Sequence, residues 1–136
     1  MATTPVTLKV DGFKDREVAS VSYTFNQSID KENQPAGIPR GGLITIKVKA
    51  QNDGNPELPR WMINKSMSKN GEIIFMISAD ADKKMKSIKF EKAYCIDFKE
   101  QWDDSTTNKD LVHWEQIIIS CQKIDIEGVK YESEWK

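Results

Sequence analysis

Residues 87–98 read SIKFEKAYCIDF, and large hydrophobic side chains recur at every second position along most of this segment. One parity carries them, interrupted by a single lysine: Ile88, Phe90, Lys92, Tyr94, Ile96 and Phe98. The other parity is mostly polar: Ser87, Lys89, Glu91, Ala93, Cys95 and Asp97. Because successive side chains of a β-strand point to opposite faces, this period of two predicts a strand with one buried and one solvated face. Such strands are typical of antiparallel sheets.

The rest of the chain repeats this pattern with one exception. Residues 16–25 and 43–50 also alternate, while 72–78 and 112–124 contain continuous hydrophobic runs that predict strands buried on both faces. Short strands are expected at 6–10 and 129–135. Only residues 56–66 have hydrophobic residues at a helical spacing, with Asn55 as the expected N-cap and Pro56 in the first turn. The sequence therefore predicts a mainly β fold with one short helix.

Length and composition exclude several classes of protein. The 136 residues suit a single domain spanning 1–136. The formal net charge of −1 argues against nucleic-acid binding, which depends on an excess of Lys and Arg. No apolar run reaches the ~20 residues of a membrane-spanning helix, so no membrane insertion is expected. The first residues lack the basic and apolar regions of a signal peptide, and two cysteines are too few for a disulfide scaffold.

Residues 26–42 form the longest segment without strand or helix periodicity. Loops beyond ~12–15 residues in compact domains are usually functional or disordered. This segment contains Pro35, Pro39 and three glycines, two of them in the Gly41-Gly42 pair that enters the next strand. We therefore expect a long loop with restricted conformations, and a close approach of two backbone segments at the glycine pair.

Candidate catalytic groups are few. His113 is the only histidine, and Cys95 and Cys121 are the only cysteines, so any nucleophilic or metal site would use them. The cysteine spacing is not that of a structural zinc site, and the favoured interpretation is that the thiols are small core or subsurface residues and that the histidine lies at a strand end. The carboxylate pairs Asp80/Asp82 and Asp103/Asp104 are interpreted as solvated turns between strands. We therefore expect no catalytic residues, no metal and no cofactor, and a function that lies in surfaces.

The order of these segments resembles the tube protein of type VI secretion systems, the Hcp or TssD family, in its Bacteroidetes version. The resemblance rests on a series of segments over nearly the whole chain. These are 21–30 (VSYTFNQSID), Arg40-Gly41-Gly42, 44–48 (ITIKV), Trp61-Met62, 71–77, 88–98 with Trp102, and 118–121 leading to Ile124 and Gly128.

The resemblance implies a small β-barrel of two packed, mostly antiparallel sheets, with the short helix at about 56–66 on its flank and the long loop at 26–42. It also implies a non-enzymatic subunit of hexameric rings that stack into a tube, made in the cytoplasm and secreted without a signal peptide. Partners would be other copies of the chain and the sheath, spike and effector proteins of the machine. The long loop would contribute to contacts between copies, through Asn26, Gln27, Ile29, Asp30, Ile38, Pro39, Arg40, Gly41 and Gly42.

A ring also needs a polar lumen that does not retain its cargo. Polar rows on two predicted strands are candidates for lining it: Thr45, Lys47 and Lys49, and Lys89 and Glu91. Two alternatives remain open. One is a small barrel that binds an apolar ligand, although many bulky inward side chains would fill it. The other is a metal-dependent protein or enzyme that uses His113 and the cysteines.

Overall fold

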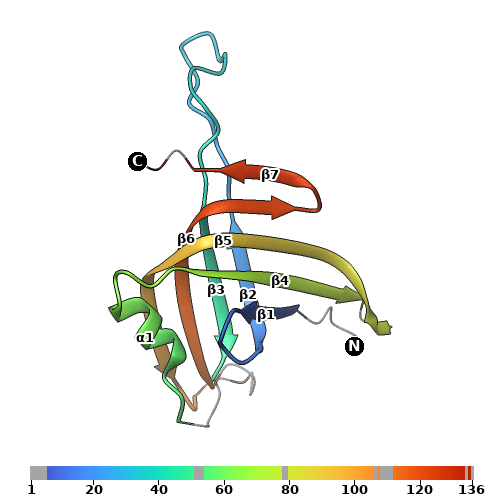
Figure 1. The fold of residues 1–136 in the computed structure, drawn as a ribbon, viewed down its shortest axis with the longest axis vertical. Helices are drawn as coiled ribbons and strands as arrows, with labels where there is room; N and C mark the ends of the chain where they lie inside the picture. Colours follow the sequence, from blue (N-terminus) through green and yellow to red (C-terminus); the bar gives the residue numbers. More distant parts are fainter. Residues whose placement is uncertain are drawn as a thin grey trace.

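The computed structural model describes residues 6–50, 54–77, 80–105, 107, 112–133 and 135. These residues form seven strands and one short helix. The elements in chain order are β1 (Val6–Val10), β2 (Arg16–Tyr23), β3 (Leu43–Lys49), α1 (Glu57–Ile63), β4 (Lys69–Ile77), β5 (Asp80–Trp102), β6 (His113–Ile126) and β7 (Val129–Glu132). The prediction of a mainly β fold with one helix is confirmed (Figure 1).

The strands form a closed antiparallel barrel. They are hydrogen-bonded in the order β3-β2-β1-β4-β5-β6-β7, and a further pairing of β3 with β6 closes six of them into a ring. The remaining strand, β7, extends the sheet beyond β6. Strands β5 and β6 are long and bend, so that β4 and the first half of β5 cross in front of β2 and β3 (Figure 1). The barrel therefore has two walls, one built around β2 and β3 and one around β4 and β5.

Hydrophobic side chains fill the barrel interior. The alternation predicted for 43–50 is confirmed, because every second side chain of β3 is fully buried, from Ile44 through Ile46 to Val48. Ile117 and Ile119 of β6 lie directly opposite Ile46 and Ile44 and are also fully buried. Each such side chain contributes about 1.5–3 kcal/mol by leaving water. This core stabilises the barrel without any metal or disulfide among the described residues.

The prediction that Ile88, Phe90, Tyr94, Ile96 and Phe98 share one buried face is wrong for Tyr94 and Ile96, whereas Phe98 packs against the core after a register shift between Cys95 and Asp97. Ile88 and Phe90 are buried, but the next buried side chains are Ala93 and Cys95, and Ile96 is 47% exposed. The parity changes at Lys92, whose φ of 50° is left-handed. The Asn70 side-chain oxygen accepts a hydrogen bond from the Lys92 backbone N–H at 3.0 Å, which supports this unusual conformation. The strand therefore turns a corner of the barrel where simple alternation predicts a straight run.

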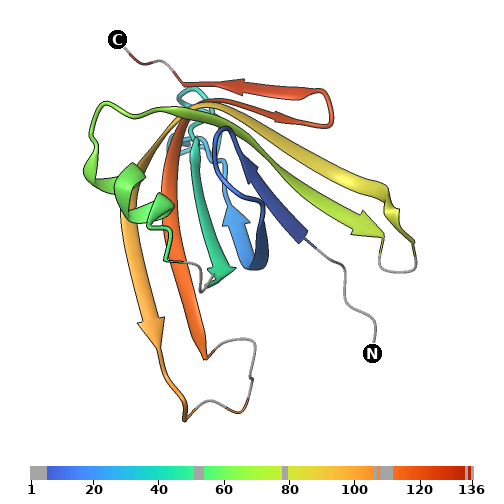
Figure 2. The same ribbon diagram turned by 60° about the horizontal axis from the view of Figure 1, so that its bottom comes forward.

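The helix α1 is shorter than the predicted 56–66 and is not capped by Asn55. Its N-cap is Pro56, and the Asn55 side chain instead donates to the Glu57 carboxylate at 2.9 Å. Leu58 and Trp61 are buried, and the Trp61 indole N–H donates to the Met67 carbonyl at 3.1 Å. Figure 2 shows α1 on the flank of the barrel, beside β5.

The two carboxylate pairs predicted to lie in turns have different backbone structures. Asp80 and Asp82 do not lie between strands, because β5 begins at Asp80, which pairs with Ile77 of β4. Asp103, in contrast, lies in a turn, where its carboxylate accepts hydrogen bonds from the Ser105 N–H at 2.9 Å and from the Ser105 hydroxyl at 2.5 Å. These bonds hold the pKa of Asp103 below its usual value.

Candidate assembly surfaces

The segment between β2 and β3 forms an arm, residues 24–42, that projects from the barrel (Figure 1). Its two sides run antiparallel and are held by backbone hydrogen bonds. Asn26 and Arg40 exchange a pair of them at 2.9 and 2.6 Å, and the Ala36 N–H donates to the Ser28 carbonyl at 2.8 Å. The predicted irregular loop is therefore a hydrogen-bonded hairpin arm.

The tip of the arm is shaped by a single carboxylate. Asp30 Oδ1 accepts hydrogen bonds from the backbone N–H groups of Glu32 and Gln34, at 2.9 and 3.0 Å. Asn33 adopts a φ of 67°, which asparagine tolerates better than most residues. These contacts are local to the arm, so its shape does not depend on the hydrophobic core.

The predicted assembly residues divide into two groups. All side chains from 24 to 40 are exposed, including the candidates Asn26, Gln27, Ile29, Asp30, Ile38, Pro39 and Arg40. Three large hydrophobic side chains of the arm are exposed: Ile29 is 60%, Ile38 48% and Phe25, at the base, 38% exposed. Gly41 and Gly42 instead lie at the base of the arm, where they contact the barrel.

The base of the arm is a close approach of two segments, as the glycine pair predicts. A Cβ at Gly41 would lie 2.3 Å from the ring of Phe25, so any larger residue would displace this ring. Gly42 has a φ of +96°, and its carbonyl accepts a hydrogen bond from the Cys121 N–H at 2.7 Å. The Gly41 N–H donates to the hydroxyl of Tyr131, on β7, at 3.1 Å. Local sequence patterns do not single out Tyr131, which is distant in the chain and lies in a short strand.

The two sets of candidate lumen residues lie on different walls of the barrel. Thr45, Lys47 and Lys49 are half-buried on the outer face of β3, whose neighbours are β2 and the first half of β6. Lys89 and Glu91 are exposed on the first half of β5, whose neighbours are β4 and the second half of β6. The two sets therefore point outward from different walls of the barrel.

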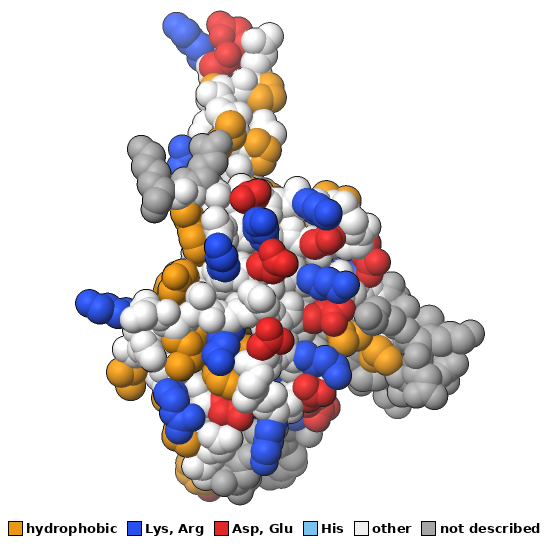
Figure 3. Space-filling view, in the orientation of Figure 1, with side chains coloured by type: hydrophobic (Ala, Val, Ile, Leu, Met, Phe, Trp, Pro, Cys, Tyr) orange, Lys and Arg blue, Asp and Glu red, His pale blue; other side chains and the backbone are white. Residues whose placement is uncertain are grey.

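The wall that contains Lys89 carries a regular alternation of charge. Residues directly opposite one another across five neighbouring strands have charges of alternating sign: Lys9, Glu72, Lys89, Asp125 and Lys130. A second row has the opposite order: Glu91, Lys123 and Glu132. Figure 3 shows these basic and acidic side chains interspersed over one face. Opposite charges placed across strands stabilise the sheet, each pair by roughly 0.2–1 kcal/mol.

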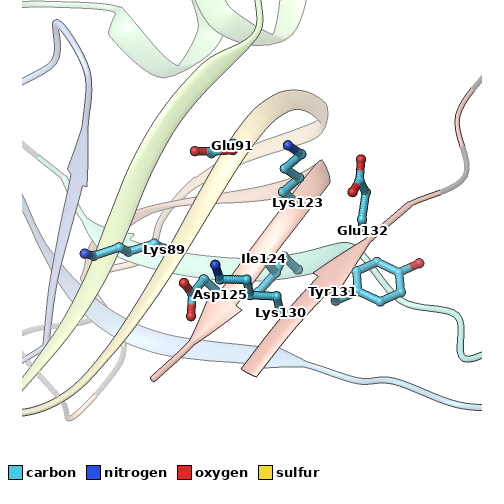
Figure 4. A pocket seen from close by; sticks show the side chains of 8 residues that line it. All are labelled: Lys89, Glu91, Lys123, Ile124, Asp125, Lys130, Tyr131 and Glu132. Carbon is cyan, nitrogen blue, oxygen red and sulfur yellow. The ribbon is translucent and has the colours of Figure 1, made fainter. Parts of the chain in front are cut away.

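This charged wall is hollowed between β5 and β7. The depression has a volume of about 500 Å³, and six of the eight residues that line it are charged (Figure 4). Sites for apolar ligands are lined mainly by hydrophobic and aromatic side chains. Core side chains occupy the barrel interior, so the structure does not favour the alternative of an apolar ligand bound inside the barrel.

The histidine and the two cysteines do not form a common site. His113 lies at the first residue of β6, as predicted, and its Nε2 is 2.7 Å from the carboxylate of Glu100. Cys95 and Cys121 are free and buried. Burial raises the pKa of the Cys95 thiol to about 11 and that of the Cys121 thiol to about 12, so neither is a ready nucleophile or metal ligand. No group of three or more His, Cys, Asp or Glu side chains in the described part of the chain is arranged to hold a metal ion.

The tryptophans have different environments. Trp61 is 1% and Trp114 8% exposed, whereas Trp102 is 63% exposed. Trp114 is covered on the outer wall by Lys47, whose ammonium lies 4.2 Å from the ring centre, and by Lys99 at 5.6 Å.

Among the described residues, no helix is long and apolar enough to cross a membrane.

A filled barrel with a hydrogen-bonded arm, whose side chains from 24 to 40 are exposed, defines a structural subunit that acts through its surfaces. The model of one family, hemolysin coregulated protein Hcp (TssD), matches residues 2–136, and the chain belongs to this family. It is an inner tube protein of the type VI secretion system and not an enzyme. Members of the family form hexameric tube rings and are secreted by this system.

Solved structures agree with this assignment. Hcp1 from Flavobacterium johnsoniae is 33% identical, with a TM-score of 0.84 over 95% of this chain and 99% of that chain. Hcp1 from E. coli EAEC 042 is 15% identical, with a TM-score of 0.73 over 97% and 99%. The secreted protein Hcp3 from Pseudomonas aeruginosa is 14% identical, with a TM-score of 0.61 over 98% and 99%. The last two show a common fold. No curated protein matches the chain in sequence.

Proposed function

We propose that six copies of this chain, each acting as one domain over residues 1–136, close into a ring, and that the rings stack through the arm. The observation that carries this proposal is the arm itself, because a segment with every side chain from 24 to 40 exposed contributes nothing to the core of its own barrel. Its internal hydrogen bonds fix its shape before a partner arrives. Docking a preformed segment therefore costs less ordering than docking a flexible loop.

The arm offers polar groups to a neighbouring copy and, beyond its base, two large hydrophobic side chains. Asn26, Gln27 and Arg40 offer hydrogen bonds that exchange readily with water. Ile29 and Ile38 would each fill a small hollow on a neighbouring copy. A tube that must assemble and later come apart requires an interface of this modest kind, since large hydrophobic interfaces are typical of obligate assemblies. Ring closure itself is a heterologous contact repeated around a rotation axis.

The wall built around β2 and β3 is the better candidate for the lumen, with Thr45, Lys47 and Lys49 on it. The arm is the direct extension of β2 and β3, so stacking along the arm would place these walls end to end from ring to ring (Figure 1). Small hydroxyl side chains also occur on this wall, at Ser20 and Ser22, which lie opposite Lys47 and Thr45. The charged wall with Lys89 and Glu91 would then face away from the lumen.

The ring and the arm are tested on the same preparation. Native mass spectrometry of the purified protein is expected to give six chain masses, and negative-stain images are expected to show rings and tubes. A variant with residues 29–38 replaced by a short Gly-Ser linker is expected to retain rings and lose tubes. A wild-type protein that stays monomeric would refute the ring, and normal tubes from the linker variant would refute the role of the arm.

The assignment of the wall that faces the lumen is tested with two variants that each carry one introduced cysteine. Thr45→Cys and Lys89→Cys are each labelled with a biotin maleimide in assembled tubes and then incubated with streptavidin, which is too large to enter a narrow lumen. Streptavidin is expected to decorate the Lys89→Cys tubes along their length and to leave the Thr45→Cys tubes bare. The reverse pattern would assign the lumen to the charged wall.

The proposed role as a tube subunit also implies a secretion route and a set of protein partners. We infer synthesis in the cytoplasm, expulsion with the tube, and contacts with the sheath, spike and effector proteins of the machine. Secretion assays on the linker variant test this route, because a subunit that cannot enter tubes would remain in the cell.

A further inference from the structure

We propose that Tyr131 of β7 is a positioning residue that fixes the direction of the arm relative to the barrel. The inference rests on the proposed role of the arm in stacking. The arm sets its own shape through backbone hydrogen bonds and the Asp30 carboxylate, but none of these contacts ties it to the barrel. Its orientation is therefore decided at its base, where residues 24–25 and 41–42 join β2 and β3.

Tyr131 makes two contacts at this base, one with each side of the arm. Its hydroxyl accepts the hydrogen bond from the Gly41 N–H at 3.1 Å. Its ring packs against the ring of Phe25, with the centroids 5.1 Å apart. Because both sides of the hairpin are held by one side chain, rotation of the arm about its base would break at least one contact. Phe25 in turn lies on Gly41, where any Cβ would be 2.3 Å from its ring.

The strand that carries Tyr131 is itself anchored to the barrel. Four residue pairs join β7 to β6, and the Ser133 N–H donates to the Gln122 carbonyl at 2.7 Å. The Ser133 hydroxyl donates to the Cys121 carbonyl at 3.0 Å, and the Cys121 N–H donates to Gly42. Tyr131 also packs against the hydrophobic core. The role of the extra strand β7, which the six-stranded barrel does not need for closure, is thus to present Tyr131 to the arm.

The chain supplies a matched control for the hydroxyl. Tyr23 also packs against Phe25, with the centroids 5.9 Å apart. Its hydroxyl accepts a hydrogen bond from the Lys86 ammonium at 3.5 Å. Tyr131→Phe and Tyr23→Phe therefore remove the same group from two rings that touch the same phenylalanine. Only the first removes a contact with the arm backbone.

The glycines supply a second matched pair. Alanine at Gly41 would displace the Phe25 ring, whereas a Cβ at Gly37, within the arm, would lie 3.8 Å from Ser28 in ordinary van der Waals contact. Gly41→Ala is therefore expected to disturb the base of the arm, and Gly37→Ala to leave it unchanged.

The experiment measures arm direction separately from assembly. Spin labels are placed on cysteines introduced at Lys31, at the arm tip, and at Ala19, on β2, and labelled subunits are diluted into an excess of unlabelled protein. The distance distribution is expected to be narrow in the wild type, in Tyr23→Phe and in Gly37→Ala. It is expected to broaden or shift in Tyr131→Phe and Gly41→Ala. Amide exchange at Gly41 is expected to accelerate about fivefold in Tyr131→Phe, as loss of one ordinary hydrogen bond implies.

An unchanged distance distribution and unchanged Gly41 exchange in Tyr131→Phe would overturn the positioning role. Broadening in Tyr23→Phe to the same extent would also overturn it, because the effect would then belong to aromatic packing in general. If Tyr131→Phe broadens the distribution and tubes still form normally, the positioning role stands. The proposed role of the arm in stacking then fails.

Discussion

The barrel and the arm of this protein are stabilised by different forces. In the barrel, fully buried isoleucines from β3 and β6 face one another and exclude water. In the arm, every side chain from 24 to 40 is exposed, and the backbone hydrogen bonds of residues such as Asn26 and Arg40 maintain its shape. The two regions meet only at a small base, where Phe25, Gly41 and Tyr131 are in contact.

Because of this difference, we expect substitutions that change the stability of the subunit and substitutions that change its assembly to fall in different regions. Substitutions in the barrel change the free energy of unfolding, because they alter buried hydrophobic area. Substitutions in the arm change what the folded subunit can bind, because the exposed arm contributes little buried area to its own chain. Variants in each region can show how far the residues that stabilise the barrel differ from those that serve assembly.

The largest effect is expected from Ile117→Ala in the barrel core. Ile117 is fully buried, and its truncation should lower the free energy of unfolding by about 2–5 kcal/mol, through lost burial and the cavity that remains. The matched control is Ile118→Ala, the next residue, which is half-buried on the outer face of β6. Urea denaturation of both variants measures the difference. Equal losses for the two would contradict the assignment of the inward face.

A second effect on the barrel depends on pH. The pKa of the Cys121 thiol is raised by burial from 9.0 to about 12, so the folded state retains its proton where the unfolded state ionises. This contribution to stability is fully present below pH 9 and is lost as the pH rises towards 12. At pH 10.5 the unfolded state should gain about 2 kcal/mol relative to pH 8 from this group alone.

The control for this titration is Cys121→Ala, which cannot ionise. The difference in unfolding free energy between wild type and variant should become less favourable to the wild type as the pH rises from 8 to 10.5. Comparison of the two proteins cancels the titration of lysines and tyrosines that they share. Parallel pH profiles would show that the thiol is not buried as described.

Replacement of residues 29–38 by a Gly-Ser linker should change the free energy of unfolding by less than about 1 kcal/mol, since loop-closure entropy varies slowly with length. The same variant is expected to lose tubes. Thermal unfolding followed by circular dichroism gives the first quantity, and negative-stain imaging gives the second. A large loss of stability in this variant would show that the arm supports its own barrel, and the separation between the two regions would fail.

The sequence predicted the barrel better than the arm, for a physical reason. Alternation of buried and exposed residues is a direct consequence of strand geometry, so β3 and its inward side chains could be assigned from residues 43–50 alone. The corner at Lys92 could not be assigned in this way, because the left-handed backbone conformation of Lys92 is supported by the side chain of Asn70, which is distant in the sequence.

The contacts at the base of the arm could likewise be predicted from the sequence only in part. Gly41 and Gly42 indicated a close approach, since only small residues permit one. Neither glycine identifies its partner, and Tyr131 lies 90 residues further along the chain. Contacts of this kind are set by the pairing of strands, which a local pattern does not encode.

The smallest effect is expected from His113→Ala. His113 is the only histidine, and the catalytic alternative depends on it together with Cys95 and Cys121. Its Nε2 lies 2.7 Å from the Glu100 carboxylate, but His113 is 31% and Glu100 48% exposed, and surface pairs of this kind contribute only about 0–1 kcal/mol. Cys95 and Cys121 are buried with raised pKa values, so His113 has no activated thiol to assist. The variant should therefore fold, form rings and form tubes as the wild type does, as measured by urea denaturation, native mass spectrometry and negative-stain imaging. Loss of tubes in a folded His113→Ala protein would place this strand end at a contact between copies and extend the assembly surface from the arm to the barrel.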